Sequence, residues 1–256
     1  DRGQRLQGRD ARDGGRRCLV ERDVFGIAAG SFAPFAVAKE AKLVLKPEHV
    51  PFDQAATATI SGITALQALT SVGRVEPGQH VMVIGASGGV GSFAVQLAKA
   101  LGATVTGVAS GPKLEAVRAL GADHVLDYTT TDIDHHRQAY DLIIDTGGRN
   151  PLARLRRALT PTGTLVIVGG EDGDRLTGGV GRQLRAALLS PLVKQRLAFF
   201  LSEESLDYIE ALAQHLADGT VVSAIGQRFT LDEVPAAIEA MEAGTLTTKA
   251  VITVQP

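Results

Sequence analysis

The sequence lacks the features that mark several classes of protein. Its single cysteine, Cys18, cannot form an internal disulfide or a zinc site built from several cysteines. No apolar run is long enough to span a membrane, and the first residues do not have the pattern of a signal peptide. A formal net charge of −2 provides no basic field for nucleic acid. With 45% hydrophobic and 21% charged residues, the chain is expected to be a cytoplasmic enzyme or binding protein.

The first 22 residues also lack an apolar period, whether of a helix or of a strand. They are rich in Arg, Asp and Gly and cannot bury enough apolar surface to order themselves. We therefore expect residues 1–22 to form a disordered tail. A basic docking arm is the alternative, and the interspersed aspartates weigh against it. The chain begins with Asp1 rather than Met, and we expect a truncated or misread start.

What the sequence does contain is glycine and an alternation of strand and helix patterns. Short apolar runs separated by amphipathic segments predict a parallel sheet covered on both faces, the doubly wound architecture of the α/β class. Strands are expected at residues 81–86, 104–110, 124–128, 140–146 and 163–170, with helices at 89–103, 112–122 and 151–161. Earlier segments predict a small β unit at 23–47 and a helix at 52–75. Later ones predict a helix at 204–217, a strand near Val221, a helix at 231–243 and a final strand at 250–254.

The most informative stretch is VMVIGASGGVGSFAVQLAKALGA, residues 81–103. A dinucleotide-binding turn needs small residues where a strand becomes a helix, and Ala86, Gly88 and Gly91 occupy those places. The pyrophosphate would then lie on the free N–H groups of the helix. A P-loop would need a lysine directly after the last glycine, and Ser92 stands there instead.

A serine hydrolase is the remote alternative for the same turn. Gly85, Ser87 and Gly89 spell the G-x-S-x-G of a nucleophile elbow, and Asp145 and His215 follow in the right order. However, His215 lies in a regular helical pattern, and the predicted parallel sheet starts at this strand instead of several strands earlier. Both observations favour the dinucleotide.

The end of the second strand favours NADPH over NADH. An NAD site usually has an acid there to hold the ribose hydroxyls. Ser110 occupies that position and Lys113 follows, and a hydroxyl with an ammonium suits a 2′-phosphate. The alternative is that Lys113 is a solvated lysine in the first turn of a helix.

At this point the residues resemble a known family. GSFAPFAVA, KLVLKP, SGITALQAL, the glycine turn, GADHVLDY, YDLIIDTGG, LTPTGTLVIVGG and KAVITV occur in the order typical of the medium-chain dehydrogenase/reductases, in their zinc-independent quinone oxidoreductase branch. The resemblance implies an NADPH-dependent reductase of quinones or α,β-unsaturated carbonyls, often a homodimer. It also implies a Rossmann-type domain at residues 49–195, a partial GroES-like substrate domain at 23–48, and a C-terminal segment at 196–256 that returns to the substrate domain.

The resemblance also implies site residues. The cofactor would contact Thr64 and the turn residues Ala86, Ser87, Gly88, Gly89, Val90 and Gly91 through its phosphates. Its adenosine end would lie near Ser110, Lys113 and Tyr128, and its nicotinamide near Thr146, Val168, Gly169 and Gly170. Lys249 is a weaker candidate. The catalytic acid or base remains unassigned, and Phe199 and Phe200 could form an apolar substrate wall or plain core or dimer contacts.

Zinc is not expected. The zinc-dependent relatives have a cysteine where this chain has Ser61, and the His/Asp cluster at residues 132–136 is expected to be a solvated face. Most of the family's substrate domain would precede residue 24, where this chain has the unmatched first segment. A binding module without catalysis therefore stays open beside the enzyme.

Overall fold

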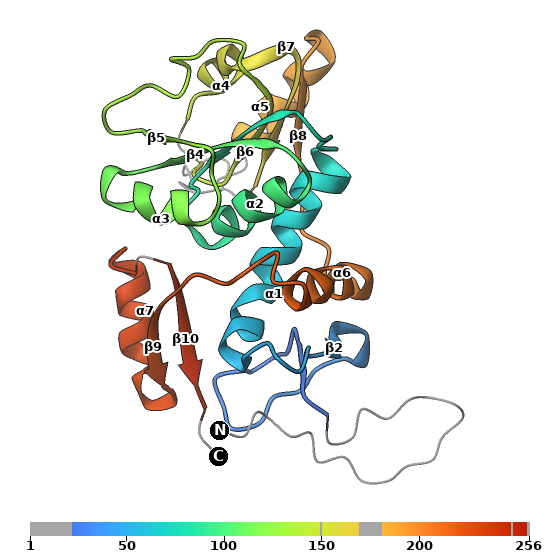
Figure 1. The fold of residues 1–256 in the computed structure, drawn as a ribbon, viewed down its shortest axis with the longest axis vertical. Coiled ribbons are helices and arrows are strands. Elements are labelled where there is room, and N and C mark those ends of the chain that lie inside the picture. The colour runs from blue at the N-terminus through green and yellow to red at the C-terminus, as the bar shows by residue number, and fades with distance from the viewer. Residues whose placement is uncertain (1–21, 149, 169–180, 247, 255–256) are drawn as a thin grey trace, which may run out of the picture.

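The computed structural model describes residues 22–148, 150–168, 181–246 and 248–254 (Figure 1). The predicted tail, apart from its last residue, and the candidate residues Gly169 and Gly170 lie outside this part of the chain.

A six-stranded parallel sheet forms the centre of the molecule. Its order is β5-β4-β3-β6-β7-β8, with every neighbouring pair parallel. The strands are β3 (His80–Ile84), β4 (Thr104–Ala109), β5 (His124–Asp127), β6 (Tyr140–Asp145), β7 (Leu159–Ile167) and β8 (Arg196–Phe199). The order reverses between β3 and β6, and at such a point an open α/β sheet has a crevice beyond the carboxyl ends of its strands. The predicted Rossmann-type α/β fold is confirmed.

The strands alternate their side chains between two apolar cores. Val81 and Val83 face a cluster that includes residues of α1, α2 and α6, whereas Met82 and Ile84 face a cluster that includes α4 and α5. Because both faces are covered, these strands are near-continuous apolar runs, and that is why the sequence reveals them. The helices are α2 (Gly89–Ala100), α3 (Leu114–Ala119), α4 (Leu152–Ala158) and α5 (Gly181–Leu189).

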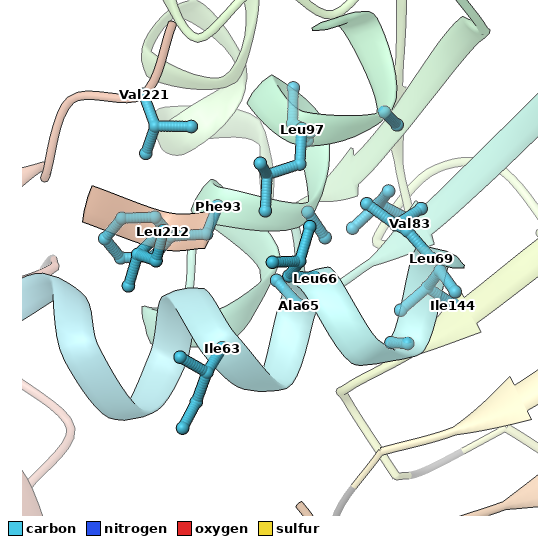
Figure 2. Packing of buried hydrophobic residues seen from close by; sticks show 14 of the residues in the cluster. Ile63, Ala65, Leu66, Leu69, Val83, Phe93, Leu97, Ile144, Leu212 and Val221 are labelled. Carbon is cyan, nitrogen blue, oxygen red and sulfur yellow. The ribbon is translucent and has the colours of Figure 1, made fainter. Parts of the chain in front are cut away.

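Helix α1 (Phe52–Gln67) connects the sheet with the rest of the molecule, and it continues as a π-helical turn, Ala68–Val72. It packs on α2 and on α6 (Leu206–Ala217), and Figure 1 shows it running from the sheet towards the smaller elements. Figure 2 shows α1 residues such as Ile63 and Leu66 beside Phe93 and Leu97 of α2.

Two small sheets lie beyond α1. β1 (Val24–Gly26) pairs antiparallel with β2 (Leu43–Leu45). β9 (Ile225–Thr230) pairs parallel with β10 (Lys249–Thr253), and α7 (Val234–Glu242) stands beside them (Figure 1). Short 3-10 turns occupy Glu40–Lys42, Gly111–Lys113, Ser190–Leu192 and Leu231–Glu233.

Two elements differ from the sequence-based prediction. β8 lies in a segment for which the sequence predicts no strand, and it extends the central sheet beyond residue 195, the predicted end of the Rossmann-type domain. The strand predicted near Val221 is wrong, because that residue is buried in irregular chain and the strand begins at Ile225. The backbone of the next two residues is bound by glutamine side chains instead of by a strand: Gln96 binds Val222, and Gln54 binds Ser223.

No helix in the described ranges is both long and apolar enough to cross a lipid bilayer.

Candidate cofactor-binding site

The chain turns sharply between β3 and α2. Gly85, the residue after β3, has a φ of 79°, a left-handed conformation that favours glycine. The N–H groups of Gly85 and Ala86 both donate to the carbonyl of Val108 on β4, at 3.1 and 3.0 Å. The left-handed residue therefore lies one position before Ala86, where the sequence pattern places the tight turn.

Gly91 allows the helix to lie directly on this turn. A Cβ atom on Gly91 would overlap the carbonyl oxygen of Gly85, a backbone atom that cannot swing aside. Gly88 is the N-cap of α2 and provides no capping side chain, and the Ser92 N–H donates to its carbonyl at 3.0 Å. The N–H groups of Gly89, Val90 and Gly91, the first three residues of α2, are the donors that the start of a helix leaves free. Together these features have the geometry of a phosphate-binding turn, with Ser87, Gly89 and Val90 half-buried around it.

The predicted adenosine end comes together because β4 pairs with β5. Ser110 follows β4 and is the N-cap of the 3-10 turn, where the Lys113 N–H donates to its carbonyl at 2.9 Å. Tyr128 follows β5, and its N–H donates to the carbonyl of Ala109 at 3.2 Å. The Tyr128 side chain is exposed. The three residues therefore lie at the same edge of the sheet.

Asp127 lies at this edge too, and it is absent from the sequence-based candidates. Its Oδ1 accepts hydrogen bonds from the hydroxyl and the N–H of Thr129, at 2.6 and 2.9 Å, and these bonds hold the pKa of Asp127 below its usual value. A Cβ on Gly111 would lie 2.7 Å from its Oδ2, so the carboxylate stands against the turn after Ser110. Its position at the carboxyl end of a predicted strand is the signal that could have found it.

The predicted nicotinamide end is held by β3, β6 and β7. The Thr146 hydroxyl donates to the carbonyl of Ile84 at 2.8 Å, and its Oγ1 fills the space where a Cβ of Gly85 would be. Asp145 is fully buried, and its Oδ1 accepts the N–H groups of Gly147 and Gly148 at 3.1 and 3.2 Å. The Val168 N–H donates to the Asp145 carbonyl at 2.9 Å. Asp145 thus shapes the loop that carries Thr146.

Helix α1 brings three buried polar side chains to one face, spaced three residues apart. We call Ser61, Thr64 and Gln67 the polar stripe of α1; they are 6%, 8% and 3% exposed. The Thr64 hydroxyl lies 3.0 Å from Ser202 Oγ and 2.7 Å from the carbonyl oxygen of Ile60. Thr64 therefore faces the segment that follows β8.

Gln67 binds that segment at two points. Its Nε2 donates to the carbonyl of Glu203 at 2.7 Å, and its Oε1 accepts the Glu203 N–H at 2.9 Å. The side chain thus replaces the strand partner that residue 203 lacks, and it fixes the chain leaving β8 against α1.

Lys249 opens β10 and reaches back to the glycine turn. Its Nζ donates to Ser61 Oγ, and a Cβ on Gly89 would lie 2.9 Å from that Nζ. Burial lowers the pKa of Lys249. Lys249, the weaker candidate from the sequence, therefore lies against Gly89, the first residue of α2.

Within the described ranges, no group of three or more His, Cys, Asp or Glu side chains could hold a metal ion. The predicted His/Asp cluster is instead tied to α4: Asp132 pairs with Arg154 at 2.7 Å, and Asp134 with Arg157 at 2.7 Å. Ser61 is engaged with Lys249.

The turn does not have the geometry of a nucleophile elbow. An elbow places its serine at the sharpest point of a strained turn. Here the left-handed residue is Gly85, and Ser87 is not among the described residues with positive φ. His215 lies in α6, the helix that packs on α1.

Comparisons with known proteins agree with this geometry. A family model described as "Zinc-binding dehydrogenase" matches residues 120–252, and one described as "Alanine dehydrogenase/PNT, C-terminal domain" matches residues 54–151. The mouse (Mus musculus) protein "NAD(P)H oxidoreductase RTN4IP1, mitochondrial" is 32% identical over 245 residues, which are 88% of this chain and 61% of that protein. The "NADPH-dependent alkenal/one oxidoreductase, chloroplastic" of Arabidopsis thaliana is 32% identical over 75% of this chain and 52% of that protein.

Among solved structures, the quinone oxidoreductase from Coxiella burnetii matches with a TM-score of 0.79 at 28% identity, over 94% of this chain and 74% of that one. Fold and turn thus have the arrangement of a dinucleotide-binding domain. The chain belongs to the medium-chain dehydrogenase/reductase superfamily and is quinone oxidoreductase-like within it. It spans about 61% of the length of the mouse relative.

Proposed function

We propose that this oxidoreductase uses NADPH to transfer a hydride to a quinone or an α,β-unsaturated carbonyl compound, without zinc. One observation carries the nucleotide-binding part: the helix that follows β3 rests on the Gly85 carbonyl through Gly91, at the point where the strand order reverses. The names of the mouse and Arabidopsis relatives and of the Coxiella burnetii structure support the reaction and the substrate class.

The residues present fit a dinucleotide. A reduced nicotinamide supplies the hydride when it is bound, and the protein supplies orientation and electrostatics. The turn from Ala86 to Gly91 would hold the pyrophosphate, together with Lys249 and Thr64. Thr146 and Val168 would lie against the nicotinamide. The buried Asp145 accepts hydrogen bonds from the N–H groups of Gly147 and Gly148 and so holds the loop that carries Thr146 in place. Displacement of this loop would misalign the reacting carbons.

The choice of NADPH rests on the loops after β4 and β5. Lys113 and Ser110 offer an ammonium and a hydroxyl for a 2′-phosphate, and the Asp127 carboxylate beside Gly111 acts against it. Lys113→Ala is expected to weaken NADPH binding about 10- to 100-fold, the value of one charge-assisted hydrogen bond, and to leave NADH binding unchanged. Asp127→Asn is expected to shift NADPH affinity in the opposite direction.

Arg118→Ala is the matched control, because it removes a positive charge from the next element, α3, where Arg118 pairs with Glu115. Dissociation constants for both cofactors can be measured by quenching or enhancement of nicotinamide fluorescence. Equal losses of NADPH and NADH affinity in Lys113→Ala would contradict a 2′-phosphate contact.

The second candidate function is a dinucleotide-binding module without catalysis, because the contacts described above build a nucleotide turn and leave the catalytic acid or base unassigned. The deciding experiment follows NADPH oxidation with a panel of quinones, enals and enones, with a chelator present. Turnover supports the reductase. Tight NADPH binding without turnover on any member of the panel would favour the module, and turnover that the chelator abolishes would contradict zinc independence.

We also propose that the protein forms a homodimer through β8. This strand ends the central sheet, and its outer edge can pair with the same edge of a second copy across a two-fold axis. Exposed apolar side chains gather along the same segment: Leu184, Leu188, Leu192, Phe199 and Leu201. Phe199 thus suits a dimer contact better than a substrate wall, whereas Phe200 packs against the core.

A further inference from the structure

Lys249 and Ser61 meet across a junction of three elements. Ser61 lies on α1, Lys249 begins β10, and both approach Gly89, the first residue of α2. A Cβ on Gly89 would lie 2.9 Å from Lys249 Nζ, 3.1 Å from its Cε and 3.4 Å from Ser61 Oγ. A side chain at position 89 would push the ammonium aside, so the glycine there serves the lysine as well as the turn.

Among the residues that the structure describes, no acidic side chain of the elements around Lys249 forms an ion pair with it. Helix α1 has one charged residue, Asp53, and β9 has one, Arg228, and these two pair with each other at 2.5 Å. Helix α2 has only Lys99, which pairs with Asp123 at 2.8 Å. In the part of the chain described, burial alone lowers the pKa of Lys249, with no contribution from a neighbouring charge.

Two positive features therefore face each other. The start of α2 is the positive end of a helix dipole with free N–H groups, and a cation beside it is unfavourable on its own. An anion between the ammonium and the helix would satisfy both. A flexible lysine in such a place needs an acceptor to hold it while the anion is absent, and Ser61 Oγ is that acceptor.

We propose that Ser61 is a positioning residue for cofactor binding: its hydroxyl accepts a hydrogen bond from Lys249 and holds the ammonium over the start of α2, where the pyrophosphate of the dinucleotide would lie. This rests on the proposed function. Ser61 need not touch the cofactor, because it acts through Lys249, and its effect on binding should vanish when the lysine is removed.

The test is a double-mutant cycle on the NADPH dissociation constant, with the whole chain and NADPH as the probe. Lys249→Met is expected to weaken binding tenfold or more, the scale of a charge-assisted hydrogen bond. Ser61→Ala is expected to weaken it about fivefold in the wild-type background, less than the loss of the ammonium itself because the lysine remains, and not at all in the Lys249→Met background.

Two further readouts separate positioning from folding. Ser61→Val and Ser61→Thr have nearly the same shape and differ in the hydroxyl, so the valine variant should lose affinity and the threonine variant keep it. Loss of the Ser61 hydroxyl also removes a hydrogen bond that stabilises the charged form of Lys249, so the pKa of this lysine should fall further. NADPH affinity in Ser61→Ala should therefore begin to fall at a lower pH than in the wild type as the solution is made alkaline.

Thr57→Ala is the control on the same helix, because its hydroxyl bonds to Ser223 Oγ at 2.6 Å and not to Lys249. It should change neither the dissociation constant nor the pH profile. Equal losses from Ser61→Ala with and without Lys249, no loss at all, or the same loss in the threonine and valine variants would overturn the role of Ser61. Wild-type protein that binds no dinucleotide would overturn the proposed function itself.

Discussion

Gly91 shows how a single hydrogen atom in place of a side chain determines the distance between a helix and a turn. Alanine in a helix is about 1 kcal/mol more favourable than glycine, so Gly91→Ala would gain stability if space were available. The Gly85 carbonyl occupies that space, and as backbone it can yield only by opening the turn. The steric cost, about 1–3 kcal/mol or more for overpacking, outweighs the gain.

Gly91→Ala is therefore expected to lower the free energy of unfolding and to weaken dinucleotide binding, measured by urea unfolding and by nicotinamide fluorescence. Gly88→Ala is the graded control, because its Cβ would meet the same oxygen at 3.2 Å and its φ of −81° suits alanine. Unfolding free energies that match in the two variants would show that the close approach at Gly91 is not a constraint.

Sequence alone identifies these glycines but not all of their roles. The strand-turn-helix pattern predicts the turn because small residues are rare at three close positions without a reason. It cannot show which residue turns left-handed, and Gly85 takes that conformation instead of Ala86. Nor can it pair Ser61 with Lys249, because the contact depends on where the last strand docks.

At the scale of elements, glutamine side chains on helices form hydrogen bonds with the backbone of irregular segments and hold them in place. Gln67 binds both backbone groups of Glu203, and Gln96 binds both of Val222, at 3.0 and 2.9 Å. A two-point amide contact satisfies the backbone as a neighbouring strand would. These segments can therefore be ordered without being strands.

Gln67→Met keeps the volume and removes both hydrogen bonds. We expect a loss of about 1–2 kcal/mol in the free energy of unfolding and faster hydrogen exchange at the Glu203 amide, because each lost bond contributes about 1 kcal/mol. Gln96→Met is the matched control, and it should accelerate exchange at Val222 instead. Unchanged protection at Glu203 in Gln67→Met would show that the amide does not hold the segment.

The same contacts explain which elements the sequence could predict. Strands β3, β4, β6 and β7 are buried on both faces, so they appear as apolar runs. β8 is a short edge strand whose apolar residues begin only after Gln195 and Arg196, and an apolar run this short does not distinguish a strand from other buried chain. Val221 is apolar because it packs in the core, but its neighbours are bound by side chains, so burial there does not mean a strand.

At the scale of the whole molecule, ion pairs make the free energy of unfolding depend on pH in acidic solution. Burial acts to raise the pKa of Asp123, but hydrogen bonds from Lys99 Nζ and from the Val105 N–H outweigh it, so this pKa lies below its usual 3.8. Burial also opposes ionisation at Asp134, but the hydrogen bond from Arg157, a backbone hydrogen bond and the charges of Arg157 and Arg154 together outweigh it, so this pKa also lies below its usual value. Both carboxylates therefore stabilise the folded state above pH 3.8 and lose that effect as pH falls through their folded pKa values.

Asp123→Asn is expected to lower the unfolding midpoint in urea at neutral pH, and the difference from wild type should shrink as the solution becomes acidic below pH 3.8. Glu210→Gln, on the exposed side of α6, removes a carboxylate without such partners and should change the midpoint little. A difference for Asp123→Asn that persists unchanged in acid would mean that its charge is not the cause.

The assembly is also a property of the whole molecule. Leu188→Glu with Leu192→Glu adds two negative charges to the exposed apolar segment beside β8. We expect the pair to convert a dimer to a monomer, as measured by light scattering after size-exclusion chromatography, with the fold unchanged by circular dichroism. Ile238→Glu with Met241→Glu, on the exposed face of α7, is the control and should leave the dimer intact.

The contact between Ser61 and Lys249 joins residues 188 positions apart, and this has a consequence for biosynthesis. A chain leaves the ribosome from its N-terminal side, so β3, the glycine turn and α2 emerge long before β10 is made. On the proposed role of Lys249, a nascent chain can assemble its nucleotide fold and still hold the dinucleotide loosely. Firm retention of the dinucleotide then begins only after translation has passed residue 249 and the new strand has reached α1.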